Sequence, residues 1–263
     1  MQYKKLMLFF SVSLPFAILL RFFTLKFIID SSNGFFTTDN QVLGLVATII
    51  LFVIALLICI FSFTTHRQPP HPPKANYYLS ALSFVLSGVV FYDTFFVKTV
   101  SEVSPILNIL RLIFAICAII FWLLYAAKSF VSIKIPSFCY LFPCFYMILK
   151  TIVEFTRIST IALITDNLLL ISALCSITVF FLQFAKLYNR VDTEKNFRKT
   201  LASGLVSVFF CIMQSVAFFI YNILSNFENI HTSVSANITL LIFGLFIMTF
   251  ILSHFSQKNS CEN

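Results

Sequence analysis

Charged side chains are scarce in this sequence, and their scarcity excludes an ordinary soluble protein. Lys, Arg, Asp and Glu make up 11% of the 263 residues, whereas 59% are hydrophobic. A soluble domain usually carries about 25% charged residues, so this chain has too few to cover a surface in contact with water. Phenylalanine, with 35 copies, adds apolar surface that suits contact with lipid. The composition therefore predicts a protein embedded in a membrane.

Motifs for metal, nucleotide and covalent chemistry are also absent. No two of the seven cysteines are spaced C-x-x-C, so we predict neither a disulfide framework nor a metal site. The sequence contains no H-E-x-x-H, G-x-S-x-G or G-x-x-x-x-G-K-[ST] motif, which argues against a zinc protease, a serine hydrolase and a P-loop ATPase. We predict no cofactor. The net charge of +8 does not indicate a nucleic-acid partner, because no basic soluble module accompanies it.

Apolar runs divide the chain into about eight segments that approach the length of a transmembrane helix, which needs about 20 residues. They span residues 6–29, 41–63, 77–97, 105–127, 137–157, 160–184, 200–225 and 236–255. The fifth and sixth runs are nearly continuous and carry charges, so a single re-entrant helix there is an alternative that removes one crossing. We predict an all-α, polytopic membrane helix bundle that forms a single integral membrane domain over residues 1–263.

Basic residues in the connections predict the orientation. The connections after the second, fourth and sixth runs contain Arg67, Lys128 and most of the basic residues of 186–199, whereas the alternate connections plainly contain only Lys98. Lys and Arg collect on the cytoplasmic side of membrane proteins. We therefore predict that both termini are cytoplasmic.

Six ionisable residues lie inside the predicted helices, toward their non-cytoplasmic ends. They are Asp93, Arg111, Lys150, Glu154, Arg157 and Asp166. Lys150, Glu154 and Arg157 are spaced i, i+4, i+7 and share one face of a helix. Ionisable side chains inside a bilayer are costly and by default indicate a functional site. We predict that this face points into the bundle, meets Asp93, Arg111 or Asp166, and forms a ligand-binding site with them.

A structural interpretation of the same residues stays open. Arg21, Lys26 and Lys150 lie near helix ends, where long basic side chains extend to the lipid headgroups. An aspartate is too short to do so, and Asp93 and Asp166 are expected to be buried and paired. Such an ion pair can hold two helices together without binding a ligand.

The outer segment Asp30-Ser31-Ser32-Asn33-Gly34-Phe35-Phe36 follows a helix that carries Arg21 and Lys26. It resembles a loop pattern in uncharacterised multi-pass membrane proteins of anaerobic Gram-positive bacteria. The resemblance covers a small part of the chain and implies location in a bacterial plasma membrane. It brings no known activity and assigns no functional residue. Gly34 would permit a tight turn, and Phe35 and Phe36 would lie at the outer interface.

Three functions are compatible with these features. The first is a non-enzymatic, transporter-like protein that transports or senses a small anionic or amphipathic solute through an outward-facing polar pocket. The second is a structural or regulatory subunit of a membrane complex, which docks a membrane protein partner through the loop 186–199. The third is an outer-leaflet lipid-modifying enzyme with Glu154 or Asp166 as general base. It ranks last because no nucleophile or metal cluster accompanies these acids.

Overall fold

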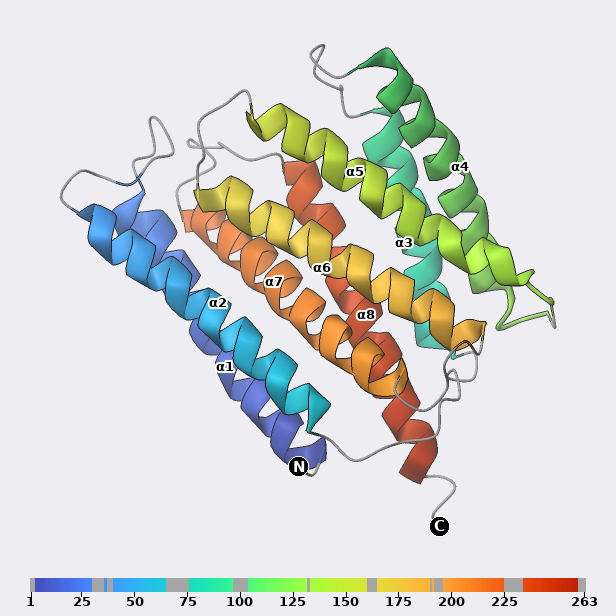
Figure 1. Ribbon diagram of the computed structural model, residues 1–263, viewed down its shortest axis with the longest axis horizontal. Coiled ribbons are helices and arrows are strands. Elements are labelled where there is room, and N and C mark those ends of the chain that lie inside the picture. The colour runs from blue at the N-terminus through green and yellow to red at the C-terminus, as the bar shows by residue number, and fades with distance from the viewer. Residues whose placement is uncertain are drawn as a thin grey trace.

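Eight helices, each long and apolar enough to cross a membrane, form the described part of the computed structural model (Figure 1). The structure describes residues 3–29, 36, 40–64, 76–96, 104–131, 133–159, 165–189, 191, 196–224 and 234–259. The helices are α1 (Tyr3–Phe23), α2 (Gln41–Phe63), α3 (Tyr77–Phe95), α4 (Pro105–Ala127), α5 (Phe142–Ser159), α6 (Thr165–Tyr188), α7 (Asn196–Leu224) and α8 (Val234–Asn259). The prediction of an all-α membrane helix bundle is confirmed.

The fifth and sixth runs form two separate helices. A short 3-10 turn, η3 (Ser137–Leu141), leads into α5, and α6 returns alongside it in the opposite direction (Figure 1). Each of the two is long enough to cross a bilayer, so the alternative of one re-entrant helix is wrong. The first helix ends in a π-helical turn, η1 (Thr24–Ile28).

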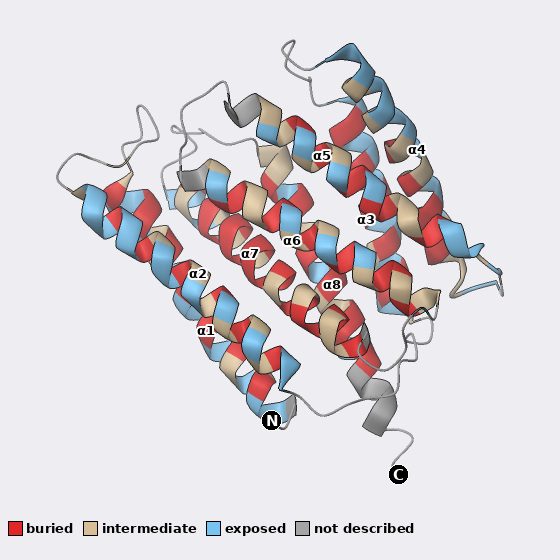
Figure 2. Cartoon of the chain, viewed as in Figure 1, coloured by how far each residue is buried: buried red, intermediate tan, exposed pale blue. Residues whose placement is uncertain are grey.

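Helix α7 lies at the centre of the packing. It contacts α1, α2, α6 and α8, and Figure 2 shows buried residues around much of its circumference, whereas α2 has an exposed outer face. Gly204 makes the close approach of two neighbours possible. A Cβ atom at this position would lie 2.8 Å from Ile251 Cδ1 on α8 and 3.2 Å from the Phe180 ring on α6.

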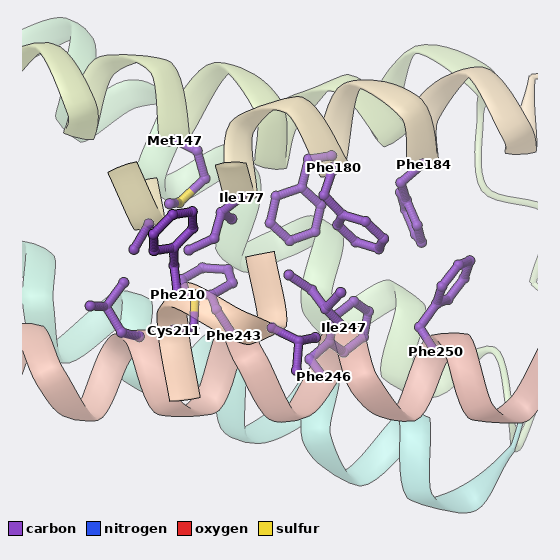
Figure 3. Close-up of a cluster of buried hydrophobic side chains, with 14 of the residues drawn as sticks. Met147, Ile177, Phe180, Phe184, Phe210, Cys211, Phe243, Phe246, Ile247 and Phe250 are labelled. Carbon is purple, nitrogen blue, oxygen red and sulfur yellow. The ribbon is translucent and has the colours of Figure 1, made fainter. Parts of the chain in front are cut away.

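Aromatic side chains from several helices interlock in the core (Figure 3). Trp122 of α4 packs edge to face on Phe246 of α8, with ring centroids 4.8 Å apart. Phe184 of α6 meets Phe250 of α8 in the same way at 5.2 Å. Many phenylalanines thus pack inside the bundle rather than only facing lipid, because helix association within a membrane depends on van der Waals packing.

The start of α1 and the end of α8 lie at the same end of the bundle (Figure 1). We call this the basic end, because α4 and α6 finish there near Lys128 and Lys186, and α7 begins there with Arg198 and Lys199. The opposite end holds the carboxyl ends of α3, α5 and α7. The first and last described helices share an end because the number of described helices is even. That the basic end faces the cytoplasm stays a prediction from the basic residues.

Phe36, which was predicted to lie at the outer interface, packs against the start of α2. Ile29 and Phe36 form an antiparallel bridge, so the chain turns back after η1. The Phe36 ring then occupies the space that a side chain at Gly44 would need at the start of α2. Gly34 and Phe35 lie outside the described residues.

Candidate functional site

A buried ion pair joins α3 to α5. Lys150 Nζ donates to Asp93 Oδ2 at 2.7 Å, and the two side chains are only 6% and 10% exposed. The Tyr146 hydroxyl donates to the same oxygen at 3.2 Å. Tyr146 and Lys150 are one helical turn apart, so one face of α5 presents both donors. The predicted pairing of this face with an aspartate on another helix is confirmed, whereas ligand binding stays a prediction.

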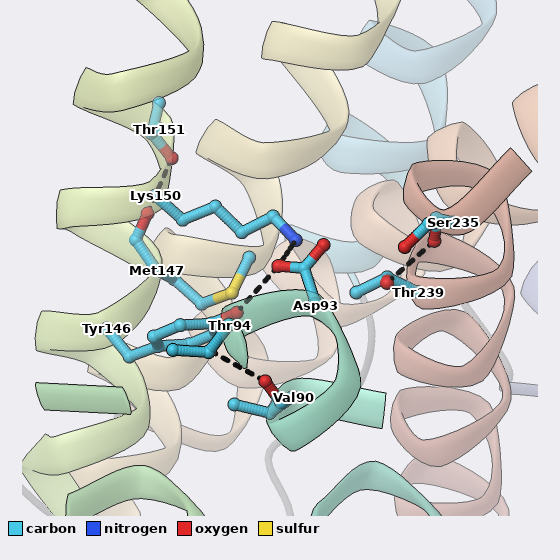
Figure 4. A network of polar contacts seen from close by, with 9 residues as sticks. All are labelled: Val90, Asp93, Thr94, Tyr146, Met147, Lys150, Thr151, Ser235 and Thr239. Atoms are coloured by element: carbon cyan, nitrogen blue, oxygen red, sulfur yellow. Dashed lines mark hydrogen bonds and ion pairs between the residues drawn. The ribbon is translucent and has the colours of Figure 1, made fainter. Parts of the chain in front are cut away.

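Asp93 lies in the last turn of α3, because this helix ends at Phe95. Figure 4 shows its carboxylate between Lys150 and Tyr146 on one side and Thr239 of α8 on the other. The neighbouring Thr94 hydroxyl donates to the Val90 carbonyl of its own helix. The oxygen Oδ2 of Asp93 therefore receives both of its hydrogen bonds from α5.

Two more of the predicted residues lie near the pair. Glu154, one turn further along α5, is half-buried and interacts electrostatically with Lys150. Arg111 on α4 is half-buried and interacts electrostatically with Tyr146. Its Nε atom is buried and has no hydrogen-bond partner among the residues that the structure describes. Arg111 and Glu154 thus lie near the pair of Asp93 and Lys150, while the side chains of Arg157 and Asp166 lie outside the described part.

Arg21 was expected either to extend to the lipid headgroups or to pair within the bundle. Its side chain is 1% exposed and its Nε donates to Gln214 Oε1 of α7 at 3.2 Å, so the structure shows the second arrangement. The buried residues Phe10, Ala17 and Arg21 are spaced as one face of α1, and α1 packs on α7 through that side. Arg21 follows Ala17 by four residues, and this helical spacing was the sequence signal that could have predicted the burial of Arg21. Lys26 is exposed, with its ammonium over the Phe27 ring.

A tyrosine cluster at the basic end went unpredicted. The hydroxyls of Tyr125 and Tyr188 are 2.7 Å apart, and the rings of Tyr140 and Tyr188 stack with centroids 4.5 Å apart. Lys128 Nζ donates to the Tyr140 hydroxyl at 3.3 Å, and its partial burial lowers the pKa of the ammonium. A space of about 10 Å³ beside Ser80 and Lys128 is near the minimum that holds one water molecule. Nothing in the sequence links these residues, because they come from α4, η3 and α6.

Three cavities among the described residues lie away from the ion pair. Besides the small space beside the tyrosines, two larger ones run between α2 and α6. None of these three is lined by Asp93, Arg111 or Lys150. The pair is therefore closed off from them in this structure.

Comparison with known proteins does not assign the chain to a group. No protein-family model, no curated protein and no solved structure matches it. The chain is a multi-pass membrane protein by its eight apolar helices, and a more specific function has to be argued from its own residues.

Proposed function

We propose that this non-enzymatic, multi-pass protein of the bacterial plasma membrane transports or senses a small anionic or amphipathic solute. In this proposal Lys150 and Arg111 form the cationic side of the binding site. The Asp93 carboxylate pairs with the Lys150 ammonium when the site is closed, and the anionic solute replaces Asp93 as the partner of Lys150 when the site opens. The observation that carries the proposal is the 2.7 Å contact between Lys150 and Asp93 in the protein interior.

Physical arguments favour a functional role for the charges of Lys150, Asp93 and Arg111. A buried ion pair rarely stabilises a protein more than two well-packed hydrophobic side chains would. Ionisable residues within membrane-spanning helices are functional candidates by default, since their desolvation is costly. Arg111 adds a buried donor atom without a partner among the described residues, and a buried donor in that state favours an incoming acceptor. An anionic solute would supply that acceptor.

A structural or regulatory subunit is the second candidate. It is favoured by the near-complete burial of Lys150 and Asp93 and by the absence of either residue from the three cavities described above. Under this alternative the pair joins α3 to α5 permanently, and water never reaches it. The two candidates therefore differ in whether the pair becomes accessible to water in the membrane.

Cysteine accessibility tests this difference. In a variant without native cysteines, Thr94→Cys places a thiol beside Asp93, and the substitution removes only a hydroxyl that bonds within its own helix. Under the proposal, a small water-soluble thiol reagent applied outside intact cells labels position 94, and sodium acetate slows the labelling. Val85→Cys on α3, which is 44% exposed on the outside of the bundle, is the lipid-facing control and stays unlabelled. If position 94 reacts only after unfolding in detergent, the solute proposal fails and the subunit remains.

A further inference from the structure

We infer that the groove between α2 and α6 binds one anionic phospholipid, with its phosphate at the basic end. Both helices pack on α7, which lies between them in Figure 1 and lines the cavity nearer the basic end through residues such as Val206. This site lies on a different part of the bundle from Asp93 and Lys150 and does not depend on the solute proposal.

The groove consists of two cavities along the same pair of helices. The one nearer the start of α2 has a volume of about 620 Å³ and is lined by apolar residues such as Ile49, Phe52 and Leu168. The other, of about 400 Å³, lies where α2 ends and α7 begins, and its lining includes Cys59 and Val206. Both volumes fall in the range of binding sites for small molecules, about 300–1,000 Å³. An acyl chain matches an apolar groove that follows the helix axes.

Among the lining residues, a charged side chain occurs only toward the basic end of the groove. Gln183 and Lys199 line the second cavity, and Arg198 Nη1 lies 3.5 Å from the carbonyl of Phe63, another lining residue. The Nε atom of Arg198 is a buried donor without a hydrogen-bond partner among the described residues, and a phosphate oxygen could accept from it. The buried Oε1 atom of Gln183 also has no partner among these residues, but as an acceptor it suits a headgroup hydroxyl rather than the phosphate. The Ser203 hydroxyl donates to the carbonyl of Lys199. Two cations thus lie where a lipid phosphate would lie.

This arrangement favours a lipid over a helix of another protein. Among the described lining residues, positive charge lies at one end of the apolar groove and not at the other, which complements a molecule with a hydrocarbon tail and a single phosphate. Basic pockets between transmembrane helices on the cytoplasmic side are typical binding sites for anionic headgroups. The predicted orientation places the basic end on that side, where the inner leaflet supplies such lipids.

Lipid titration of the purified full-length protein tests the inference. In detergent, binding of phosphatidylglycerol and phosphatidylcholine with identical acyl chains is measured by native mass spectrometry. We expect one tightly bound phosphatidylglycerol and at least a tenfold preference for it over phosphatidylcholine. Lys199→Gln should weaken phosphatidylglycerol binding about fivefold, the factor that corresponds to about 1 kcal/mol per basic residue, and leave phosphatidylcholine unchanged. Lys186→Gln, at the same end but outside the cavity lining, is the matched control and should retain the preference.

Three results would overturn the inference. Equal binding of the two lipids would remove the headgroup site. An equal loss in the Lys186→Gln and Lys199→Gln variants would show a diffuse charge effect instead of a site. Cys59 lines the groove, so efficient oxidative cross-linking of Cys59 between two chains in membranes, abolished by Cys59→Ser, would show that a second copy occupies it. Val206→Trp, which fills the cavity, should weaken both lipids if an acyl chain lies there.

Discussion

Replacing Lys150 alone should destabilise the protein more than replacing Lys150 and Asp93 together. The ammonium and the carboxylate are 2.7 Å apart and nearly inaccessible, so Lys150→Met leaves Asp93 buried with Tyr146 as its remaining α5 donor. Removing one partner of a buried pair costs about 3–5 kcal/mol. Asp93→Asn should cost a similar amount, because it strands the Lys150 ammonium.

The double variant should cost much less than the sum of the two single changes. With both charges gone, no ion is left in the interior, and the Tyr146 hydroxyl can still donate to the amide oxygen of Asn at position 93. We expect a loss of about 1–2 kcal/mol, which is the usual cost of a disturbed buried hydrogen bond. The coupling free energy between the two positions should then be at least about 4 kcal/mol, the difference between the summed single losses and the loss in the double variant.

Unfolding in mixed lipid and detergent micelles provides the measurement. The single tryptophan, Trp122, is fully buried in the aromatic core, so its fluorescence reports loss of packing during titration with sodium dodecyl sulfate. Lys26→Met is the control, because Lys26 is exposed and an exposed charge contributes less than about 1 kcal/mol. Strictly additive free energies of unfolding for Lys150→Met and Asp93→Asn would refute the reasoning, since additivity means that the two side chains do not interact.

Two further predictions concern helix packing and orientation. Gly204→Ala should lower the free energy of unfolding by about 1–2 kcal/mol, because the added methyl overlaps Ile251. Gly88→Ala is the control, because the added methyl meets open space, and it should raise the free energy of unfolding by up to about 1 kcal/mol through helix propensity. The same fluorescence assay measures both variants, and equal effects would contradict the close packing at Gly204. Single cysteines replacing Pro70 or Asp192, both outside the described residues, should resist a thiol reagent confined to the outside of intact cells, and labelling of either would reverse the predicted orientation.

Hydropathy located the helices well because a bilayer imposes both a minimum length and an apolar surface. The predicted ranges 41–63 and 105–127 coincide with α2 and α4. The start of α7 was placed four residues too late, at 200 instead of Asn196. Its first turn contains Arg198 and Lys199, and a polar turn beyond the apolar run gives no hydropathy signal although the backbone is helical.

Helix periodicity also gave part of the candidate site. The spacing of Lys150 and Glu154 placed both on one face of α5, and the cost of a lone charge in a membrane required a partner. The choice of Asp93 as that partner depended on how α3 lies relative to α5. For Arg21 the sequence left open whether the side chain extends to the headgroups or pairs within the bundle, and the packing of α1 on α7 buried it beside Gln214.

The sequence by itself determined that this protein is a bundle of membrane-spanning helices with ionisable residues in its interior, since composition, run length and helical spacing are local properties. Tertiary structure alone decided which residues meet: Asp93 with Lys150, Arg21 with Gln214, and the tyrosines of α4, η3 and α6 with one another. The physical reason is that apolar helices in lipid all have the same hydrophobic surface. Their neighbours are selected by the shapes of side chains such as Gly204 and Phe180, and by the few polar contacts that those shapes permit.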